Sequence, residues 1–276
     1  MSSGVVINTN VPSIQASRVL SKNRGELEQS MARLASGKRI NSAADDAAAA
    51  SVALKMKADI ASGDMAVRNI NDGISLFQTL DGAATEVENI LVRMRELATQ
   101  MNNETYASAD RTSANTEYQA LLSEIDRIAD NTEFNRTDIA NGTSGFQIQL
   151  GAAGSDKGTF SNVDLNIAAG ALNVTGTLIT TTTNAALAIT AIDTALGTVS
   201  TNRATVGSNI NRLGFALSNA QNVSQRLNEA LSGLQDTDYA AESANLARGM
   251  VLAQAGTAML AQANQAPQYV LALLRS

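Results

Sequence analysis

Apolar residues recur at heptad spacing near the start of the chain. Leu20, Leu27 and Leu34 stand seven residues apart, and Met31 lies among them. This spacing predicts a helix over residues 5–35 with one narrow apolar stripe. Because so narrow a stripe cannot stabilise an isolated helix, we expect the helix to require a partner.

A longer helix follows a short break at residues 36–45. Gly37 ends the first pattern, and Ser42 with Asp45 forms a capping-box sequence that predicts the next helix start at about residue 46. The apolar positions then alternate four- and three-residue steps to about residue 102, as in a coiled coil. Such a helix spans about 85 Å. Its predicted seam includes Ile60, Val67, Ile70, Ile74, Phe77 and Leu91.

The alternation slips once, between Phe77 and Leu80, where a three-residue step is repeated. Such a slip, called a stammer, predicts local overwinding of the supercoil. Two interpretations are open. The slip helps the long helix to adopt alternative packings, or it is an ordinary adjustment of phase.

The middle of the chain changes from helical to alternating patterns. Tyr118, Leu122 and Ile125 mark one face of a shorter helix that ends near Asp130. Between residues 131 and 182, an Asn-Gly pair at 141–142 and alternating apolar residues predict a β-hairpin insert. We expect its strands around Phe146, Ile148 and Leu150, and around Val163, Leu165 and Ile167.

A second long heptad pattern runs from residue 189 to residue 234. Its predicted seam includes Ile192, Leu196, Leu213 and Leu227, and only Arg203 and Ser224 in it are polar. Since each long helix has one apolar stripe and neither has a core of its own, we expect the two to pair antiparallel.

A final stripe follows a break at residues 235–238. Its positions are Leu246, Met250, Ala253, Thr257, Leu260 and Asn264, continued by Leu271 and Leu274. The predicted fold is therefore mostly α, with long antiparallel coiled-coil rods, a small β-hairpin insert and paired terminal helices. The expected divisions are residues 1–35, 36–45, 46–182, 183–234 and 235–276.

Composition removes most catalytic chemistry. The chain has no Cys and no His, so it lacks thiol nucleophiles, imidazole bases and zinc-type clusters. The paired acids at 45–46 and 236–238 stand at helix breaks, where capping explains them better than metal binding does. We expect no enzyme activity and no cofactor. The net charge of −6 does not favour nucleic-acid binding.

Neither a signal sequence nor a membrane span is evident. Residues 1–10 lack a basic segment followed by an apolar one, and no run of about 18 apolar residues occurs. We therefore expect a protein that does not insert into membranes and is exported, if at all, without a cleaved signal peptide.

Both ends of the chain resemble the bacterial flagellin family. The matching segments are residues 6–10 (VINTN), 34–48 (LASGKRINSAADDAA), 254–264 (QAGTAMLAQAN), 267–268 (PQ) and 270–275 (VLALLR). The resemblance covers residues 4–150 and 185–276. Residues 49–51 depart from the Gly-Leu-Ala that the family usually has there. The middle is short, so we expect no large outer domains.

The resemblance implies a structural subunit that polymerises into the extracellular flagellar filament for swimming motility. In this family the two end segments form an inner tube, and the rods form an outer tube. The residues expected to build the inner tube are Leu20, Leu27, Met31, Leu34, Leu246, Met250, Leu260, Leu271 and Leu274. The implied partners are other copies, an export chaperone, the filament cap and the hook–filament junction proteins.

Two further features follow from the resemblance. Arg93, Leu97 and Glu117 match the surface that vertebrate Toll-like receptor 5 reads on many flagellins, although Val92 replaces the usual Gln. A solvated rod face is the alternative interpretation. Thr180, Thr181, Thr182 and Thr183 are candidate O-glycosylation sites, and a bare polar loop is the alternative there.

Other functions compete with a bulk filament subunit. A hook–filament junction protein has similar end segments and should stop at a short ring instead of polymerising. A coiled-coil signalling stalk also has long heptads, but it should carry a membrane span or a sensory domain.

Overall fold

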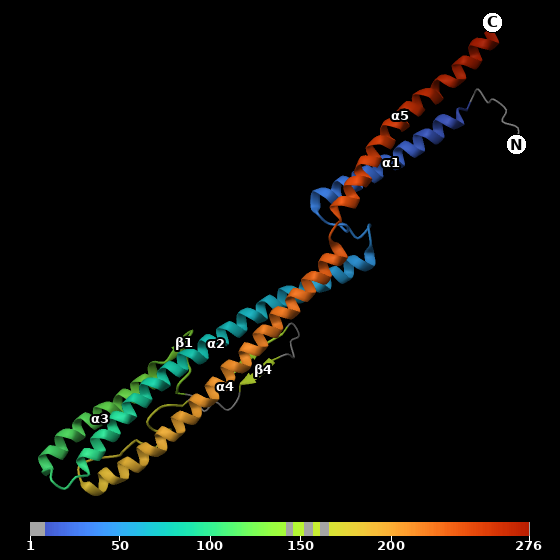
Figure 1. Ribbon diagram of the computed structural model, residues 1–276. Coiled ribbons are helices and arrows are strands. Elements are labelled where there is room, and N and C mark those ends of the chain that lie inside the picture. The colour runs from blue at the N-terminus through green and yellow to red at the C-terminus, as the bar shows by residue number, and fades with distance from the viewer. Residues whose placement is uncertain (1–8, 142–145, 152–156, 161–165, 276) are drawn as a thin grey trace. The chain divides into compact units, whose positions relative to one another are not determined.

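The computed structural model describes residues 9–141, 146–151, 157–160 and 166–275, and the side chains of residues 146, 157, 159–160 and 267–275 lie outside the description. The mostly helical fold class is confirmed (Figure 1). The helices are α1 (Val11–Ser36), α2 (Ala47–Met101), α3 (Ser108–Asn131), α4 (Thr182–Gln235) and α5 (Tyr239–Arg275). The strands are β1 (Glu133–Phe134), β2 (Thr137–Asp138), β3 (Phe146–Gln149) and β4 (Lys157–Phe160).

The chain divides into two compact units. Unit 1 combines residues 1–58 with residues 227–276, and unit 2 is residues 59–226. The boundary between them falls within α2 and α4. The five divisions expected from the sequence remain a prediction. In the part of the chain that the structure describes, no helix is long and apolar enough to span a membrane.

In unit 2, polar side chains show that α2 and α4 run antiparallel. The residue number on α4 falls as the number on α2 rises. The contacts are Ser224 Oγ to Asp64 Oδ1 at 3.0 Å, Arg203 to Asp81 at 2.9 Å and to Glu88 at 2.6 Å, and Arg95 to Asp193 at 2.6 Å. The predicted antiparallel pairing is confirmed. Both polar positions of the predicted α4 seam have partners on α2.

Unit 2 also contains α3 and the segment 166–179, which complete its core. Tyr118 of α3 is fully buried, and its hydroxyl lies 2.7 Å from Thr177 Oγ1. Burial raises the pKa of the Tyr118 phenol, and the hydrogen bond to Thr177 opposes that shift. Asp126 Oδ1 accepts a hydrogen bond from Ala169 N at 2.9 Å, and Asn115 Oδ1 accepts one from Ile179 N at 3.0 Å. The segment is therefore fixed by hydrogen bonds to side chains of α3.

The predicted stammer in α2 is wrong. The buried positions keep a regular alternation of four- and three-residue steps through the whole of unit 2. These positions are Ala66, Ile70, Gly73, Phe77, Leu80, Ala84, Val87, Leu91, Met94, Ala98 and Met101, and the buried Leu76 and Leu97 lie beside them. The apparent slip arose because the larger Val67 and Ile74 were assigned to the seam in place of their small neighbours Ala66 and Gly73.

Small residues occupy the seam because other parts of the chain approach α2 closely there. A methyl group at Gly73 would collide with Ile148 Cδ1 of β3. Of the predicted rod-seam residues, Ile70, Phe77, Leu91, Ile192 and Leu213 are fully buried. The others, Ile60, Val67, Ile74, Leu196 and Leu227, are half-buried.

The hairpins differ from the prediction. β1 and β2 pair antiparallel around Asn135 and Arg136, both of which have positive φ (52° and 62°), as a type I′ turn requires. β3 lies where it was expected, but its partner β4 is at residues 157–160. The second strand was therefore placed too late in the sequence. Ile167 is buried outside any strand, and Val163 and Leu165 lie outside the described residues.

One helix start and one helix cap also differ from the prediction. α1 begins at Val11, later than the predicted residue 5, because Asn10 Oδ1 caps Ser13 N and Pro12 suits the first turn. The predicted capping box at Ser42 does not start α2. Asp46 caps that helix through Ala49 N at 2.9 Å.

Candidate assembly interface

In unit 1, α1 and α5 lie side by side and antiparallel (Figure 1). At one end of this terminal pair, Asn10 Nδ2 donates to the Ala263 carbonyl oxygen at 2.7 Å, and Ser13 Oγ bonds Asn264 Oδ1 at 2.7 Å. At the other end, Arg33 Nη1 lies 3.8 Å from Glu242 Oε2. Polar contacts at both ends therefore fix the register of the two helices.

Between these ends, leucines of α1 pack on glycines of α5. A Cβ added to Gly256 would lie 3.2 Å from Leu20 Cδ1, and one added to Gly249 would lie 3.6 Å from Leu27. The two glycines are seven residues apart, as the two leucines are. Each leucine therefore fills the space left by a missing side chain, and the helices approach closely.

The residues expected to build the inner tube fall into three groups. Leu20 is buried, and Leu27, Leu34, Leu246 and Leu260 are half-buried along the seam of the terminal pair. Met31 and Met250 are exposed and flank that seam. Leu271 and Leu274 have no described side chains. Their role in assembly stays a prediction.

The chain segments that follow α1 and precede α5 form a short ladder, which we call the junction (residues 37–45 and 234–238). Gly37 has φ +71°, the left-handed conformation that glycine adopts most easily at a helix end. Thr237 N donates to the Gly37 carbonyl oxygen at 3.0 Å, and Arg39 N donates to the Gln235 carbonyl oxygen at 2.7 Å. Lys38 and Asp236 form an antiparallel β-bridge between these bonds. The sequence patterns gave no signal for this ladder.

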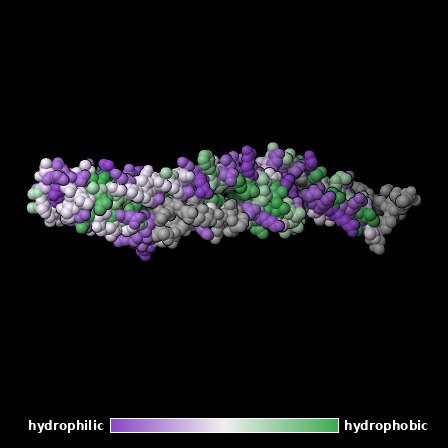
Figure 2. All heavy atoms as spheres, turned by 90° about the horizontal axis from the view of Figure 1, so that it is seen from below, coloured by the Kyte–Doolittle hydropathy of each residue, from purple (hydrophilic) through white to green (hydrophobic). Residues whose placement is uncertain are grey.

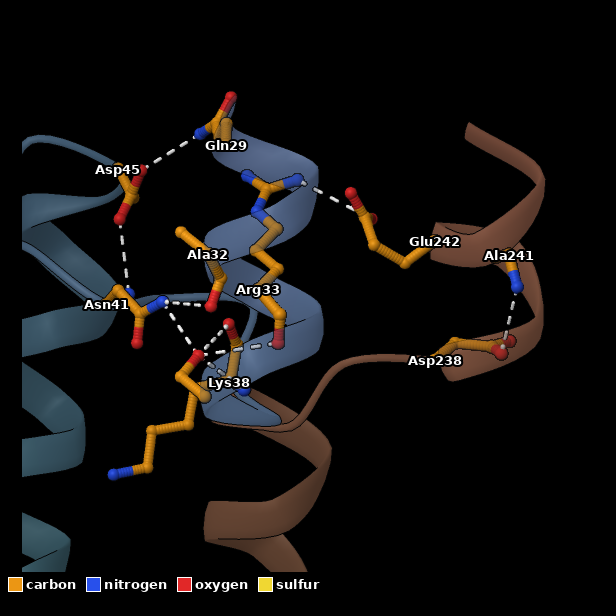
Figure 3. Close-up of polar contacts among 10 residues, drawn as sticks. Gln29, Ala32, Arg33, Lys38, Asn41, Asp45, Asp238, Ala241 and Glu242 are labelled. Atoms are coloured by element: carbon orange, nitrogen blue, oxygen red, sulfur yellow. Dashed lines mark hydrogen bonds and ion pairs between the residues drawn. The ribbon is translucent and has the colours of Figure 1, made fainter. Parts of the chain in front are cut away.

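Asp45 organises the other side of the junction (Figure 3). Its carboxylate accepts hydrogen bonds from Ser42 N at 2.9 Å, Asn41 N at 3.1 Å and Gln29 Nε2 at 2.9 Å. These donors, with the backbone amide of Ser42 the strongest, lower the pKa of Asp45. The role of Asp45 is thus to shape the loop between the helices.

Asp238 begins α5 and brings Glu242 toward α1 (Figure 3). Its Oδ1 accepts hydrogen bonds from Ala240 N at 2.9 Å and Ala241 N at 3.2 Å, as an N-cap does. Glu242 in the first turn of α5 is buried and pairs with Arg33. The acids at 238 and 46 are therefore helix caps. Within the described residues, no group of three acidic side chains could hold a metal ion.

Much apolar surface of the terminal pair remains uncovered in one copy. Among the described residues of unit 1, the buried hydrophobic ones are Leu20, Ile40 and Ala53. Figure 2 shows hydrophobic residues, in green, reaching the surface between hydrophilic ones. The exposed apolar residues of α1 and α5, which we call the exposed terminal surface, are Val11, Ile14, Val19, Met31, Tyr239, Met250, Val251, Leu252 and Met259.

The three residues that match the receptor surface differ in exposure. Arg93 Nη2 lies 2.9 Å from Glu117 Oε1, and both side chains are about half exposed. The hydrogen bonds that Arg93 donates to Glu117 and, less strongly, to Glu96 raise the pKa of Arg93. Leu97 is buried in the core of unit 2. The Arg93–Glu117 ion pair thus lies at the surface, whereas Leu97 lies in the core.

The four threonines expected as glycosylation sites lie at the start of α4: Thr180 and Thr181 precede the helix, and Thr182 and Thr183 are its first residues. Thr181 Oγ1 accepts a hydrogen bond from Asn184 N at 3.1 Å, so Thr181 caps the helix. Thr181 and Thr183 are exposed, and Thr180 and Thr182 are half-buried.

These features define a class of protein: a helical structural subunit whose two chain ends pair with each other and leave apolar side chains exposed. The comparisons with known proteins identify the family. Residues 7–144 match the bacterial flagellin N-terminal helical region, and residues 189–274 match the bacterial flagellin C-terminal helical region. The chain belongs to the bacterial flagellin family and is a structural subunit of the flagellar filament.

Individual relatives are similar in sequence along nearly the whole chain. A flagellin of Halalkalibacterium halodurans is 44% identical over 98% of this chain and 100% of its own length. A flagellin of Listeria monocytogenes is 36% identical over 98% of this chain and 99% of its own length. The flagellar filament 30.7 kDa core protein of Treponema maltophilum is 35% identical over 98% of this chain and 100% of its own length.

Solved structures share the fold. The crystal structure of Bacillus cereus flagellin is 38% identical, with a TM-score of 0.50, and the match covers 55% of this chain and 88% of that one. A putative flagellar hook-associated protein of Vibrio parahaemolyticus has a TM-score of 0.58 at 14% identity, over 70% of this chain and 100% of that one. The second likeness shows the fold alone, and the junction-protein function is not favoured.

Proposed function

We propose that the exposed terminal surface is where copies of the chain pack against one another in the filament. The supporting observation is that, among its described residues, unit 1 exposes more large apolar side chains than it buries. Its helices show many large apolar side chains to solvent, whereas few of its described hydrophobic residues are buried. An excess of exposed apolar side chains is typical of a protein–protein interface.

Covering a Val, Leu or Met side chain completely contributes about 1.5–3 kcal/mol. Residues on this surface, such as Val251 and Met259, can gain that contribution only from neighbouring copies. Because each copy presents the same surface, packing repeats from one subunit to the next.

Matched aspartate substitutions test the proposal. Val251 in unit 1 and Leu187 in unit 2 are each 65% exposed. We expect Val251→Asp to fold like the wild type by far-UV circular dichroism but to fail in polymerisation seeded with filament fragments. Leu187→Asp should still polymerise. Equal loss in both variants, or in neither, would overturn the assignment to the terminal pair.

We also propose that the chain is exported without a cleaved signal peptide and meets an export chaperone, the filament cap and hook–filament junction proteins. The family resemblance supports these partners, and an uncovered apolar surface needs protection before assembly. N-terminal sequencing of filament protein tests the export route. Co-purification of the chaperone with wild type but not with Val251→Asp tests whether it covers the same surface.

A second proposed activity is recognition by Toll-like receptor 5 through Arg93 and Glu117. Their ion pair is accessible, whereas Leu97, the third residue of the match, is buried. We expect Arg93→Ala to lower the response of receptor-bearing cells. The control is Arg127→Ala, which removes a similar exposed pair with Glu124 on α3. An unchanged response to Arg93→Ala would contradict the proposal.

O-glycosylation at Thr180, Thr181, Thr182 and Thr183 is a third proposal. The exposure of Thr181 and Thr183 supports it. Intact-mass spectrometry of filament protein should show added hexose-type masses that a Thr181→Ala and Thr183→Ala double variant lacks. A mass equal to that of the unmodified chain would reject it.

A further inference from the structure

Sulfur occurs in this chain only as methionine. There are eight Met and no Cys. Met94 and Met101 are buried in unit 2, with 0% and 2% of their surface exposed. Met31 on α1 and Met250 and Met259 on α5 expose 45%, 47% and 65%. The terminal pair therefore presents thioethers to solvent, whereas the core of unit 2 encloses them.

These three methionines flank the seam of the terminal pair. Met31 follows the buried Ser30, and Met250 follows Gly249, on which Leu27 packs. Met259 precedes Leu260, which is half-buried in the seam. All three belong to the exposed terminal surface, so a chemical change there leaves the α1–α5 contact in place and alters the surface offered to other copies.

We infer that Met31, Met250 and Met259 are modification sites for hydroperoxides in the free subunit, and that their oxidation blocks assembly. The thioether sulfur attacks the terminal peroxide oxygen, the O–O bond breaks, and the other oxygen takes up the proton and leaves as an alcohol, or as water when the oxidant is hydrogen peroxide. The sulfur becomes a sulfoxide and is oxidised by two electrons, while the peroxide is reduced by two electrons. No thiol in the chain competes for the oxidant.

The sulfoxide blocks packing because it is strongly polar. In the free subunit it stays hydrated, so the fold of each unit is unaffected. In an interface between copies it would be buried without a designed hydrogen-bond donor, which is unfavourable. Since packing covers the same sulfurs, the filament itself should resist the reaction. This inference rests on the proposed function of the exposed terminal surface.

The experiment treats the free, full-length subunit with hydrogen peroxide. Peptide mass spectrometry should find sulfoxide at Met31, Met250 and Met259, with Met94 and Met101 unmodified. The far-UV circular dichroism should not change, and the rate of seeded polymerisation should fall by about tenfold or more. Methionine sulfoxide reductases A and B should restore the rate. Filaments treated in the same way should show little sulfoxide at these three positions.

Variants distinguish a failure of this inference from a failure of the proposed assembly interface. The triple variant Met31→Leu, Met250→Leu and Met259→Leu should polymerise untreated and should keep its rate after peroxide. Met65→Leu, which removes an exposed methionine of unit 2, should remain as sensitive as the wild type. Treated wild type that carries all three sulfoxides and polymerises at an unchanged rate would overturn the inference. Normal polymerisation of Val251→Asp would instead overturn the proposed interface.

Discussion

Unit 2 surrounds its long helices with other parts of the chain, whereas in unit 1 α1 and α5 contact little except each other. In unit 2, α3 and the segment 166–179 cover α2 and α4, and the core is continuous. In the described part of unit 1 the exposed terminal surface has no such cover. Similar heptad patterns therefore give a self-sufficient core in one unit and an incomplete one in the other. The difference is that several elements pack together around the long helices of unit 2, whereas in unit 1 α1 and α5 pack mainly on each other.

The largest expected effect is on the free energy of unfolding of unit 2. Phe77→Ala, in the centre of unit 2, should lower the free energy of unfolding of the free subunit by about 3–5 kcal/mol. Leu20→Ala, in the seam of α1, should leave that main transition almost unchanged and should prevent seeded polymerisation. Urea titration followed by circular dichroism measures the first effect. Equal destabilisation by both substitutions would show that the two units unfold as one.

A smaller effect is expected where α2 is approached most closely. Gly73→Ala should lower the free energy of unfolding by about 1–3 kcal/mol, because the new methyl group meets Ile148. Gly82→Ala, on the same helix with open space around it, should be neutral or stabilising by up to about 1 kcal/mol. Thermal unfolding of the two variants side by side checks this. Similar melting temperatures would contradict a tight seam at Gly73.

The ion pairs between α2 and α4 should contribute less. A double-mutant cycle with Arg203→Met and Glu88→Gln should give a coupling energy of about 0.5–1 kcal/mol, since both side chains are partly exposed. The coupling should shrink in high salt, because mobile ions screen partly exposed charges. A coupling that salt does not change would indicate that packing, and not charge, joins these residues.

The smallest effect concerns the junction. The pKa of Asp45 is lowered in the folded state, so its hydrogen bonds stabilise the junction above its unfolded pKa and are lost as the pH falls through the folded pKa. We expect amide exchange at Asn41 and Ser42 to accelerate below about pH 4. Asp45→Asn should exchange faster at neutral pH and lose this dependence. The Asp46→Asn variant, whose partner is Ala49, is the control.

Much of the fold could be predicted because helix periodicity and helix ends are local signals. The long helices followed from the heptads, and their antiparallel pairing followed because each has one apolar stripe and no core of its own. The seams were misjudged in one consistent way. On α2 the larger Val67 and Ile74 were preferred to Ala66 and Gly73.

The same error recurs on α5, where the seam uses Gly249 and Gly256 in place of the predicted Met250 and Thr257. When a seam is assigned from hydrophobicity, the larger side chains are chosen. A close helix pair instead needs small residues at its centre and larger ones beside them. Met250 is exposed for this reason, because Gly249 occupies the seam position. Glycines at seven-residue spacing were the available signal.

The junction ladder and the β4 strand were beyond prediction. The ladder depends on backbone groups of residues 37–40 meeting those of residues 234–237. Backbone hydrogen bonds leave no mark on side-chain patterns, and their partners are nearly two hundred positions apart in sequence. The β1–β2 turn was missed because Asn135 and Arg136 adopt positive φ without glycine.

The contact between Asn10 and Ala263 has a consequence for the order in which the molecule forms. These residues are 253 positions apart, so a growing polypeptide cannot join its ends until nearly all of α5 has left the ribosome. The entropy of closing a loop rises with its length. Docking of Ser224 on Asp64 removes most of that length in advance. We therefore expect the middle of the chain to fold first and to hold the two ends near each other. A product truncated before α5 would carry α1 without its partner.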